Sequence, residues 1–160
     1  MVATPLTVAN PYIRLDKTKH YWGTTIAVLA APTRGELDAG TDLSVQGTET
    51  PGWSVTGSVV QSQSLVGPAL NLIGAQGFAE SSITLRNSRT STDGRTILIV
   101  QRPALTGYIV RFGEGDVTGY KMDVFYVGVN SAEPSDGFLD PATTTFRFAI
   151  FDARMRVTVP

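Results

Sequence analysis

The sequence predicts an all-β fold, a β-sandwich or barrel-like domain with one short flanking α-helix. Two observations support this prediction: several segments alternate apolar and polar residues with a period of two, and 16 glycines and nine prolines separate them at short spacing. A third is that one stretch alone, near residues 33–39, carries clear signals for both ends of a helix. At 160 residues the chain fits a single domain spanning 1–160.

In the first third of the chain, residues 12–16 (YIRLD) and 19–23 (KHYWG) are candidate strands. The helix signal follows them. Thr33 can cap the free N–H groups of the first turn while Glu36 reaches back to the Thr33 N–H, which is the capping-box arrangement. Gly40 can end the helix in a left-handed conformation. A helix of about two turns is not stable alone in water, so we expect it to pack through Leu37.

Residues 52–60 and 81–87 are further strand candidates, and the segment between them differs from the rest of the chain. It carries almost no charge before Glu80 and shows no sustained period. We therefore expect a long apolar loop over 61–79, exposed on one subunit and suited to docking on another. The alternative is a hairpin buried in the core. The apolar residues that would make the contact are Leu65, Val66, Leu70, Leu72, Ile73 and Phe78.

The last third of the chain has the strongest strand patterns. Residues 107–112 and 118–130 form a hairpin across 113–119, and the second strand is apolar on both faces toward its end. Residues 143–160 predict two strands, or one long strand interrupted by a bulge. Residues 131–145 are expected to form an external loop. Residues 91–100 contain a possible helical turn, although the β-branched run after Thr96 favours a strand.

Charge and composition exclude several classes of function. Thirteen basic and 14 acidic side chains leave a net charge of −1, which gives no general attraction to nucleic acid or to an anionic membrane. Without cysteine there are no disulfides or thiolate metal sites. The N-terminus does not resemble a secretory signal, and the longest apolar run, IAVLAA, is far below the ~18 residues of a membrane helix. We expect a soluble protein.

No residue pattern predicts chemistry. The single histidine, His20, has no G-x-S-x-G motif to support a triad, so a surface or hairpin position is expected. The carboxylate pairs Glu114 with Asp116 and Asp136 with Asp140 lie in segments that favour turns. The spaced glycines of 67–78 lack the ending of a phosphate-binding loop, and no calcium-loop spacing occurs. We expect no enzyme activity, no cofactor and no metal.

The order of the segments resembles that of the tail tube (major tail) proteins of long-tailed, non-contractile bacteriophages, especially those of actinobacterial hosts. The similarity extends from residue 4 to about Val129. Its most specific parts are PTRGELDAGTDL at 32–43 and GYKMDVFYVGV at 119–129. The loop 61–79 is more apolar than this family leads one to expect, and 131–145 matches no pattern of it.

This resemblance implies a structural virion protein assembled in the host cytoplasm. Six copies would close into a ring, each giving strands to a continuous inner β-barrel, and rings would stack into a tube. DNA would pass through the lumen without specific binding, so inward-facing side chains should be neutral or acidic on balance. The implied partners are further copies, the tape measure protein, the tail terminator and the distal tail protein. The helix capped by Thr33 and Glu36 would lie near a subunit boundary, and the loop 61–79 would contact the next ring.

Three alternatives remain at this point. The chain could be another virion component on a related fold, such as a tail terminator or a capsid decoration protein. It could be a carbohydrate-binding β-sandwich that presents Trp22, Trp53 or Tyr108 to a sugar, although such residues more often anchor a core or an interface. Hydrolysis through His20 or paired carboxylates is the weakest alternative.

Overall fold

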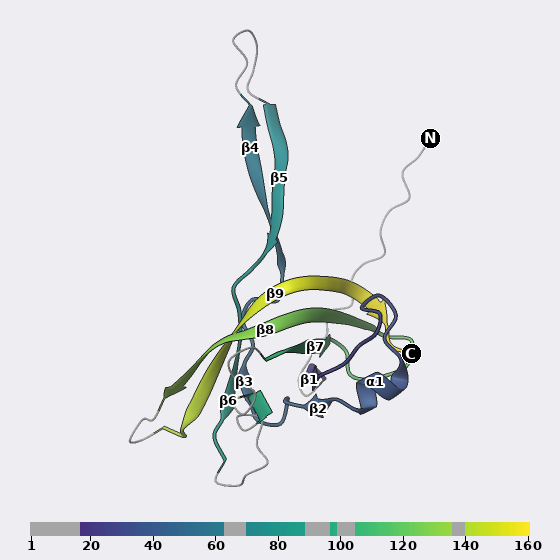
Figure 1. Cartoon of the computed structure of the whole chain (residues 1–160), viewed down its shortest axis with the longest axis vertical. Coiled ribbons are helices and arrows are strands. Elements are labelled where there is room, and N and C mark those ends of the chain that lie inside the picture. Colours follow the sequence, from purple (N-terminus) through teal and green to yellow (C-terminus); the bar gives the residue numbers. More distant parts are fainter. Residues whose placement is uncertain (1–16, 63–69, 89–96, 99–104, 136–139) are drawn as a thin grey trace, which may run out of the picture.

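Strands dominate the structure, a computed structural model of the chain that describes residues 17–62, 70–88, 97–98, 105–135 and 140–160 (Figure 1). The predicted all-β class is confirmed. The elements in chain order are β1 (Lys19–Gly23), α1 (Arg34–Asp38), β2 (Thr41–Asp42), β3 (Gly47–Glu49), β4 (Val55–Ser62), β5 (Leu70–Phe78), β6 (Ser81–Arg86), β7 (Thr106–Phe112), β8 (Lys121–Ser135) and β9 (Thr143–Thr158).

Seven strands form one antiparallel sheet in the order β2-β1-β7-β8-β9-β6-β3, and this sheet curls around its own inner face (Figure 1). The remaining two strands, β4 and β5, pair only with each other and project away from the sheet. We call this projecting hairpin, residues 55–62 with 70–78, the arm.

The centre of the sheet is the antiparallel run β7–β8–β9. The hairpin expected across 113–119 is confirmed, with Phe112 opposite Met122 at its closed end. Of the two possibilities for 143–160, the structure has one long strand whose pairing with β8 shifts register at three places. The external loop expected over 131–145 is wrong in large part, because β8 continues to Ser135 and pairs there with Thr143 at the start of β9.

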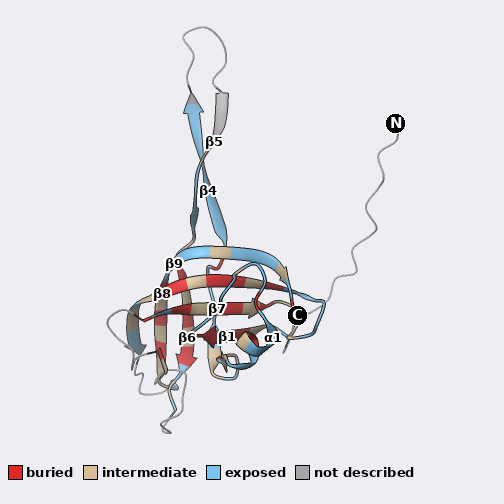
Figure 2. Cartoon of the chain, turned by 45° about the vertical axis from the view of Figure 1, so that its right-hand side comes forward, coloured by how far each residue is buried: buried red, intermediate tan, exposed pale blue. Residues whose placement is uncertain are grey.

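Apolar side chains pack on both faces of the central strands, as the sequence of β8 predicts. Ile109 and Phe125 belong to a cluster inside the curl, together with Trp22 and Trp53. Their chain neighbours Val110 and Val124 point the other way, into a second cluster closed by Leu37 of α1. Alternation along each strand therefore supplies two cores, and Figure 2 shows the buried residues concentrated in β7, β8 and β6.

The helix begins where predicted, with Thr33 as its N-cap, but it does not end as predicted. The C-cap is Ala39 in a right-handed conformation, and Gly40 is not among the glycines with positive φ. A Cβ at Gly40 would lie 3.0 Å from the Leu37 carbonyl oxygen and 3.3 Å from that of Trp22. Close packing between the helix end and β1 explains this glycine.

The loop expected over 61–79 is wrong from Leu70 to Phe78, which is strand β5 paired with β4, and residues 63–69 lie outside the described residues. The alternative of a hairpin is right for these strands, but the hairpin is exposed and not buried in the core. The strand pairing explains why the sequence of β5 shows no period of two. While β4 advances by two residues, from Gly57 to Val59, β5 advances by three, from Gln76 to Ile73, and the extra residue breaks the alternation of β5. The expected strand at the end of 91–100 is wrong where it is described, because Ile97 and Leu98 are helical. The candidate strand 12–16 lies outside the described residues.

Candidate assembly surfaces

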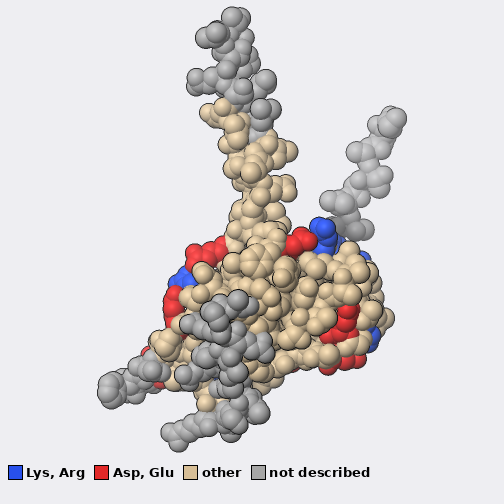
Figure 3. All heavy atoms as spheres, in the orientation of Figure 1, with Lys and Arg blue, Asp and Glu red and all other residues tan. Residues whose placement is uncertain are grey.

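The arm exposes apolar side chains that the described part of its own chain leaves uncovered. Ile73 is 87% exposed and its cross-strand partner Val59 is 68% exposed. Val55 and Phe78 form a second exposed pair nearer the body. No Asp, Glu, Lys or Arg occurs from residue 55 to 79, and the described part of the arm bears no charge in Figure 3. An isolated two-stranded hairpin is marginally stable in water, so this arm needs a surface to cover it.

The six residues predicted to make the inter-subunit contact have different outcomes. Ile73 and Phe78 lie on β5 with exposed side chains. Leu70 and Leu72 belong to the same strand, where the structure places the backbone. Leu65 and Val66 lie outside the described residues.

The base of the arm is anchored in the core by Trp53. Its indole Nε1 donates to the Ser82 carbonyl oxygen at 3.2 Å, and its backbone N–H donates to the Ser81 hydroxyl at 2.9 Å. Gly52 and Trp53 both have positive φ, at 86° and 60°. The left-handed region is unfavourable for a bulky side chain, so the buried indole fixes the direction in which the chain enters the arm.

A cluster of ion pairs fixes the exit from the arm. Glu80 lies between β5 and β6 and pairs with Arg147 of β9. Arg147 also donates to Glu133 of β8, with 2.8 Å from its Nε to the carboxylate. The Arg147 guanidinium holds the pKa of Glu133 below its usual range. The chain is therefore held to the main sheet on both sides of the arm.

The main sheet has one long open edge. Strand β6 pairs with β9 only from Thr143 to Phe148, whereas β8 follows the other edge of β9 as far as Thr158. In the described part of the chain no strand pairs with the second edge of β9 from 149 to 158, and Figure 2 shows this stretch mostly exposed. Unpaired N–H and C=O groups at such an edge are ready to pair with another strand.

The predicted capping box around α1 is present. The Glu36 backbone N–H donates to the Thr33 hydroxyl at 3.4 Å, and the Thr33 backbone N–H donates to the Glu36 carboxylate at 2.7 Å. The same carboxylate accepts from the Ala27 N–H at 2.8 Å. These hydrogen bonds, the one from Thr33 first, hold the pKa of Glu36 below its usual range. Glu36 thus ties the segment before the helix to its first turn.

A polar cluster joins the helix to the β7–β8 connection. Arg34 binds both carboxylate oxygens of Asp116, at 2.5 and 2.8 Å, and the Tyr21 hydroxyl donates to the same carboxylate at 3.1 Å. The Arg34 hydrogen bonds lower the pKa of Asp116, whereas burial and then Asp116 raise the pKa of Tyr21 to about 12. Asp116 is held by two partners here, which is a structural role. In the other predicted carboxylate pair, Asp136 with Asp140, Asp136 lies outside the described residues.

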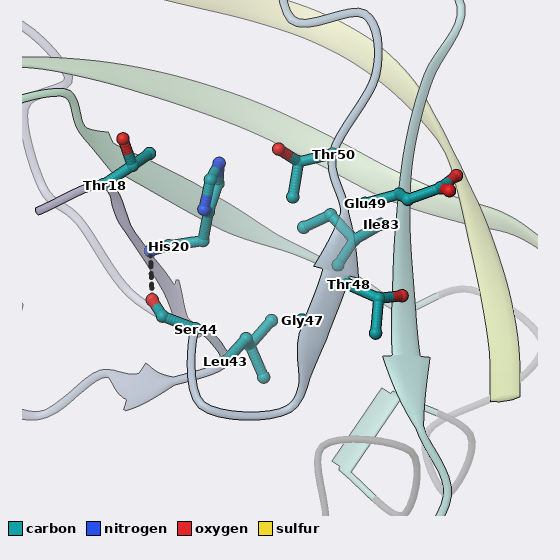
Figure 4. A pocket seen from close by; sticks show the side chains of 9 residues that line it. All are labelled: Thr18, His20, Leu43, Ser44, Gly47, Thr48, Glu49, Thr50 and Ile83. Atoms are coloured by element: carbon teal, nitrogen blue, oxygen red, sulfur yellow. Dashed lines mark hydrogen bonds between the residues drawn. The ribbon is translucent and has the colours of Figure 1, made fainter. Parts of the chain in front are cut away.

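His20 is buried in β1, 5% exposed, so the expected surface position is wrong. Its ring points into a cavity of about 160 Å³ between Thr18 and Thr50, while Glu49 is directed away from it (Figure 4). The Ser44 hydroxyl accepts from the His20 backbone N–H at 2.7 Å and not from the ring. Burial, and then Arg111, lower the pKa of His20 to about 4. A neutral imidazole without a hydroxyl or carboxylate partner does not form a triad.

Trp22 and Trp53 are both core residues, at 2% and 1% exposed, so neither offers a face to a sugar. Among the described residues, no group of three acidic, histidine or cysteine side chains is placed to hold a metal ion. Over the same residues, no helix is long and apolar enough to cross a membrane. The features that stand out are the arm and the open β9 edge, and both suit assembly with other chains.

A model of the phage tail tube protein family matches residues 7–154. The chain belongs to this family. Tail tube proteins are structural and not enzymatic, so the chain is a structural component of the phage tail, and it assembles with further copies and other tail proteins into a multimer. A comparison with curated protein sequences finds no match.

Solved structures share the fold at low sequence identity. A chain of the anti-feeding prophage baseplate, determined with six-fold symmetry, superposes with a TM-score of 0.60 at 10% identity, covering 92% of this chain and 97% of that one. A chain of the SPP1 tail tube, determined by solid-state NMR and cryo-EM, superposes with a TM-score of 0.56 at 11% identity, covering 90% of this chain and 78% of that one. At these identities the likeness shows the fold.

Sequence reasoning missed the open β9 edge and the ion pairs of Arg147 with Glu80 and Glu133. The open edge had a signal in strand length, because a strand of 16 residues cannot be covered by one of six. The ion pairs had none, since they join residues far apart in the chain. The more common role given for Trp53, an anchor of a core, is confirmed.

Proposed function

We propose that this tail tube protein closes into hexameric rings that stack into the tail tube through which the phage genome leaves. The observation that carries the proposal is the projecting arm, whose Val59 and Ile73 are 68% and 87% exposed, with nothing in the described part of their own chain covering them. Apolar surface removed from water contributes about 25 cal/mol per Å², so covering the arm on a second subunit favours assembly.

Ring closure uses the open edge of β9. A strand of a neighbouring subunit that pairs with 149–158 satisfies the free backbone groups there, and the opposite end of the sheet at β2 and β1 is the matching edge. Because the two edges differ, the contact is head-to-tail, and a rotation that closes gives a ring. Two features limit the pairing of this β9 edge with unrelated strands. One is the bulge at Arg156, whose φ is 58°, and the other is the charge of Asp152 and Arg154.

Stacking uses the arm, which runs away from the sheet and extends well beyond the body of its own subunit (Figure 1). An arm that crosses to the next ring converts separate rings into a continuous tube. The six-fold symmetry of the anti-feeding prophage baseplate structure supports six copies per ring. The helix capped by Thr33 and Glu36 is placed near a subunit boundary in this scheme.

The lumen conducts DNA without binding it, since rows of Lys and Arg would pair with phosphates and slow its passage. The net charge of −1 is in keeping with such a lumen. The remaining partners are the tape measure protein inside the tube, with the tail terminator and the distal tail protein at its ends. Assembly takes place in the host cytoplasm, and the host is an actinobacterium.

The test is negative-stain electron microscopy with light scattering over a range of concentrations, on the unaltered protein and on Ile73→Asp. We expect hollow tubes from the unaltered protein and separate rings from the variant, because a charge on the arm disfavours its burial. Val45→Asp is the matched control, since Val45 is also 87% exposed but lies in the β2–β3 turn.

Other outcomes would contradict the proposal in distinct ways. Closed rings that never stack at any concentration would favour a tail terminator, and trimers would favour a capsid decoration protein. A monomer retained by a polysaccharide resin would favour a carbohydrate-binding module. Tubes formed equally well by Ile73→Asp would remove the arm from the stacking contact.

A further inference from the structure

A row of aromatic side chains crosses the outer face of the central strands. Tyr108 of β7 lies directly opposite Tyr126 of β8, with ring centroids 5.1 Å apart, and the Tyr126 ring lies 5.4 Å from Phe151 of β9. We call these three residues the aromatic row. They continue the face that α1 covers farther along the strands, where Val110 and Phe112 are buried.

Phe151 forms the outer end of the row, where its ring packs on β8 on one side and faces solvent on the other. A Cβ at Gly128 would lie 2.9 Å from the Phe151 ring, so the absence of a side chain there lets the ring rest against the β8 backbone. Phe151 nevertheless remains 55% exposed. A large aromatic side chain held in place but left open to solvent is typical of an anchor at a protein interface.

We infer that the aromatic row is the receiving surface for the arm of a second copy of this chain. The inference rests on the stacked assembly proposed above and names the contact that holds one ring on the next. Figure 1 shows the arm crossing the direction of β7, β8 and β9, and the row crosses the same strands because its members are neighbours on adjacent strands. Arm and row therefore both lie across the direction of these strands.

The two surfaces also match in chemistry. In β4 the side chains of Val55 and Val59 lie on one face, since they are four residues apart in a strand, and each is paired with an apolar partner on β5. That face carries no charge, so laying it on tyrosine and phenylalanine rings leaves no unpaired ion behind. In Figure 1 the arm points away from β7, β8 and β9 of its own chain, so we assign the row to the arm of another copy.

Photo-crosslinking tests the contact directly. Benzoylphenylalanine placed at Ile73 is activated in tubes assembled from a mixture of isotope-labelled and unlabelled chains, and mass spectrometry maps the crosslinked peptides. We expect crosslinks between different copies, to peptides of β7, β8 or β9 that contain the aromatic row. The same probe at Val117, which is exposed and lies in the β7–β8 connection outside the arm and both open edges, serves as the control and should give no crosslinks between copies to these peptides.

The outcomes separate this inference from the assembly on which it rests. Tubes whose arms crosslink to any other surface would overturn the aromatic row as the receiver and leave stacking by the arm in place. A protein that stays monomeric would overturn both.

A substitution provides a second test that does not depend on the probe. Tyr126→Lys should raise the protein concentration needed for stacking by about tenfold or more while rings still form, because the middle ring of the row is lost and Tyr126 lies on the central strand β8, away from the 149–158 edge. Val117→Lys is the matched control, since Val117 is 49% exposed and lies in the β7–β8 connection. Thermal unfolding of both variants verifies that they fold. Equal stacking by the two variants would overturn the inference.

Discussion

The indole of Trp53 packs edge-on against the ring of Phe125, with centroids 5.1 Å apart. One residue belongs to the turn that begins the arm and the other to the central strand β8, so this contact joins the projecting hairpin to the core of the tail tube protein. Phe148 of β9 completes the site with a ring 5.5 Å from the indole.

Trp53→Ala should therefore lower the free energy of unfolding by about 3–5 kcal/mol, since a large buried aromatic is replaced by a cavity. Urea denaturation followed by circular dichroism measures the change. Val45→Ala, at an exposed position, should stay within about 0.5 kcal/mol of the unaltered protein. A loss below about 1 kcal/mol at Trp53 would show that the indole is not an anchor.

Gly52→Ala should destabilise the protein by about 1–3 kcal/mol or more. Gly52 has a φ of 86°, and its added Cβ would lie 2.3 Å from the Glu80 carbonyl oxygen, where the backbone has no room to yield. Gly35→Ala is the contrast: nothing lies within 4 Å of a Cβ there, and alanine in helix α1 should stabilise by about 0.5–1 kcal/mol. Thermal unfolding of the pair should give shifts of opposite sign.

Thr33→Ala should lower the free energy of unfolding by about 1 kcal/mol, because the Glu36 N–H loses the hydroxyl that caps it. Thr33→Ser keeps that hydroxyl and should keep most of the stability. Chemical denaturation of both variants measures the difference. If serine and alanine were equally destabilising, the loss would come from the methyl group and not from the cap.

His20 should make stability fall in mildly acidic solution. Its pKa is about 4 in the folded protein and 6.5 when unfolded, so between these values the unfolded chain binds a proton that the folded chain does not. The free energy of unfolding should therefore fall by about 3 kcal/mol as the pH drops from 6.5 to 4, with no contribution from this group above pH 7.

Denaturation from pH 4 to 8, compared with His20→Phe, isolates the contribution of the imidazole, including the influence of Arg111 and Asp42 on its pKa. The variant should lose the slope between pH 6.5 and 4. A slope that is unchanged in the variant would assign the pH dependence to carboxylates instead.

Much of the fold could be predicted from local patterns. Strict alternation around Phe146 and Phe148 located β9, the apolar faces of residues 121–129 located a strand covered on both sides, and Thr33 with Glu36 located the helix start. Each of these depends on neighbours in the chain, which a sequence displays directly.

The errors have a shared physical cause. A register shift in β5 hid the hairpin at 55–78, the burial of His20 depends on residues such as Ile83 far along the chain, and the length of β8 depends on its pairing with β9. Contacts between distant segments decided each of these cases. For the same reason strand length indicates that part of β9 is uncovered, but only its pairing with β6 and β8 locates the open edge at 149–158.

The most direct test of stacking by the arm is a cryo-EM reconstruction of the particles that the purified tail tube protein forms. The account predicts six subunits per ring, with β9 of each subunit paired along 149–158 to its neighbour and every arm lying across the next ring. A tube in which the arms stay within their own ring, or in which the 149–158 edge faces solvent, would contradict it.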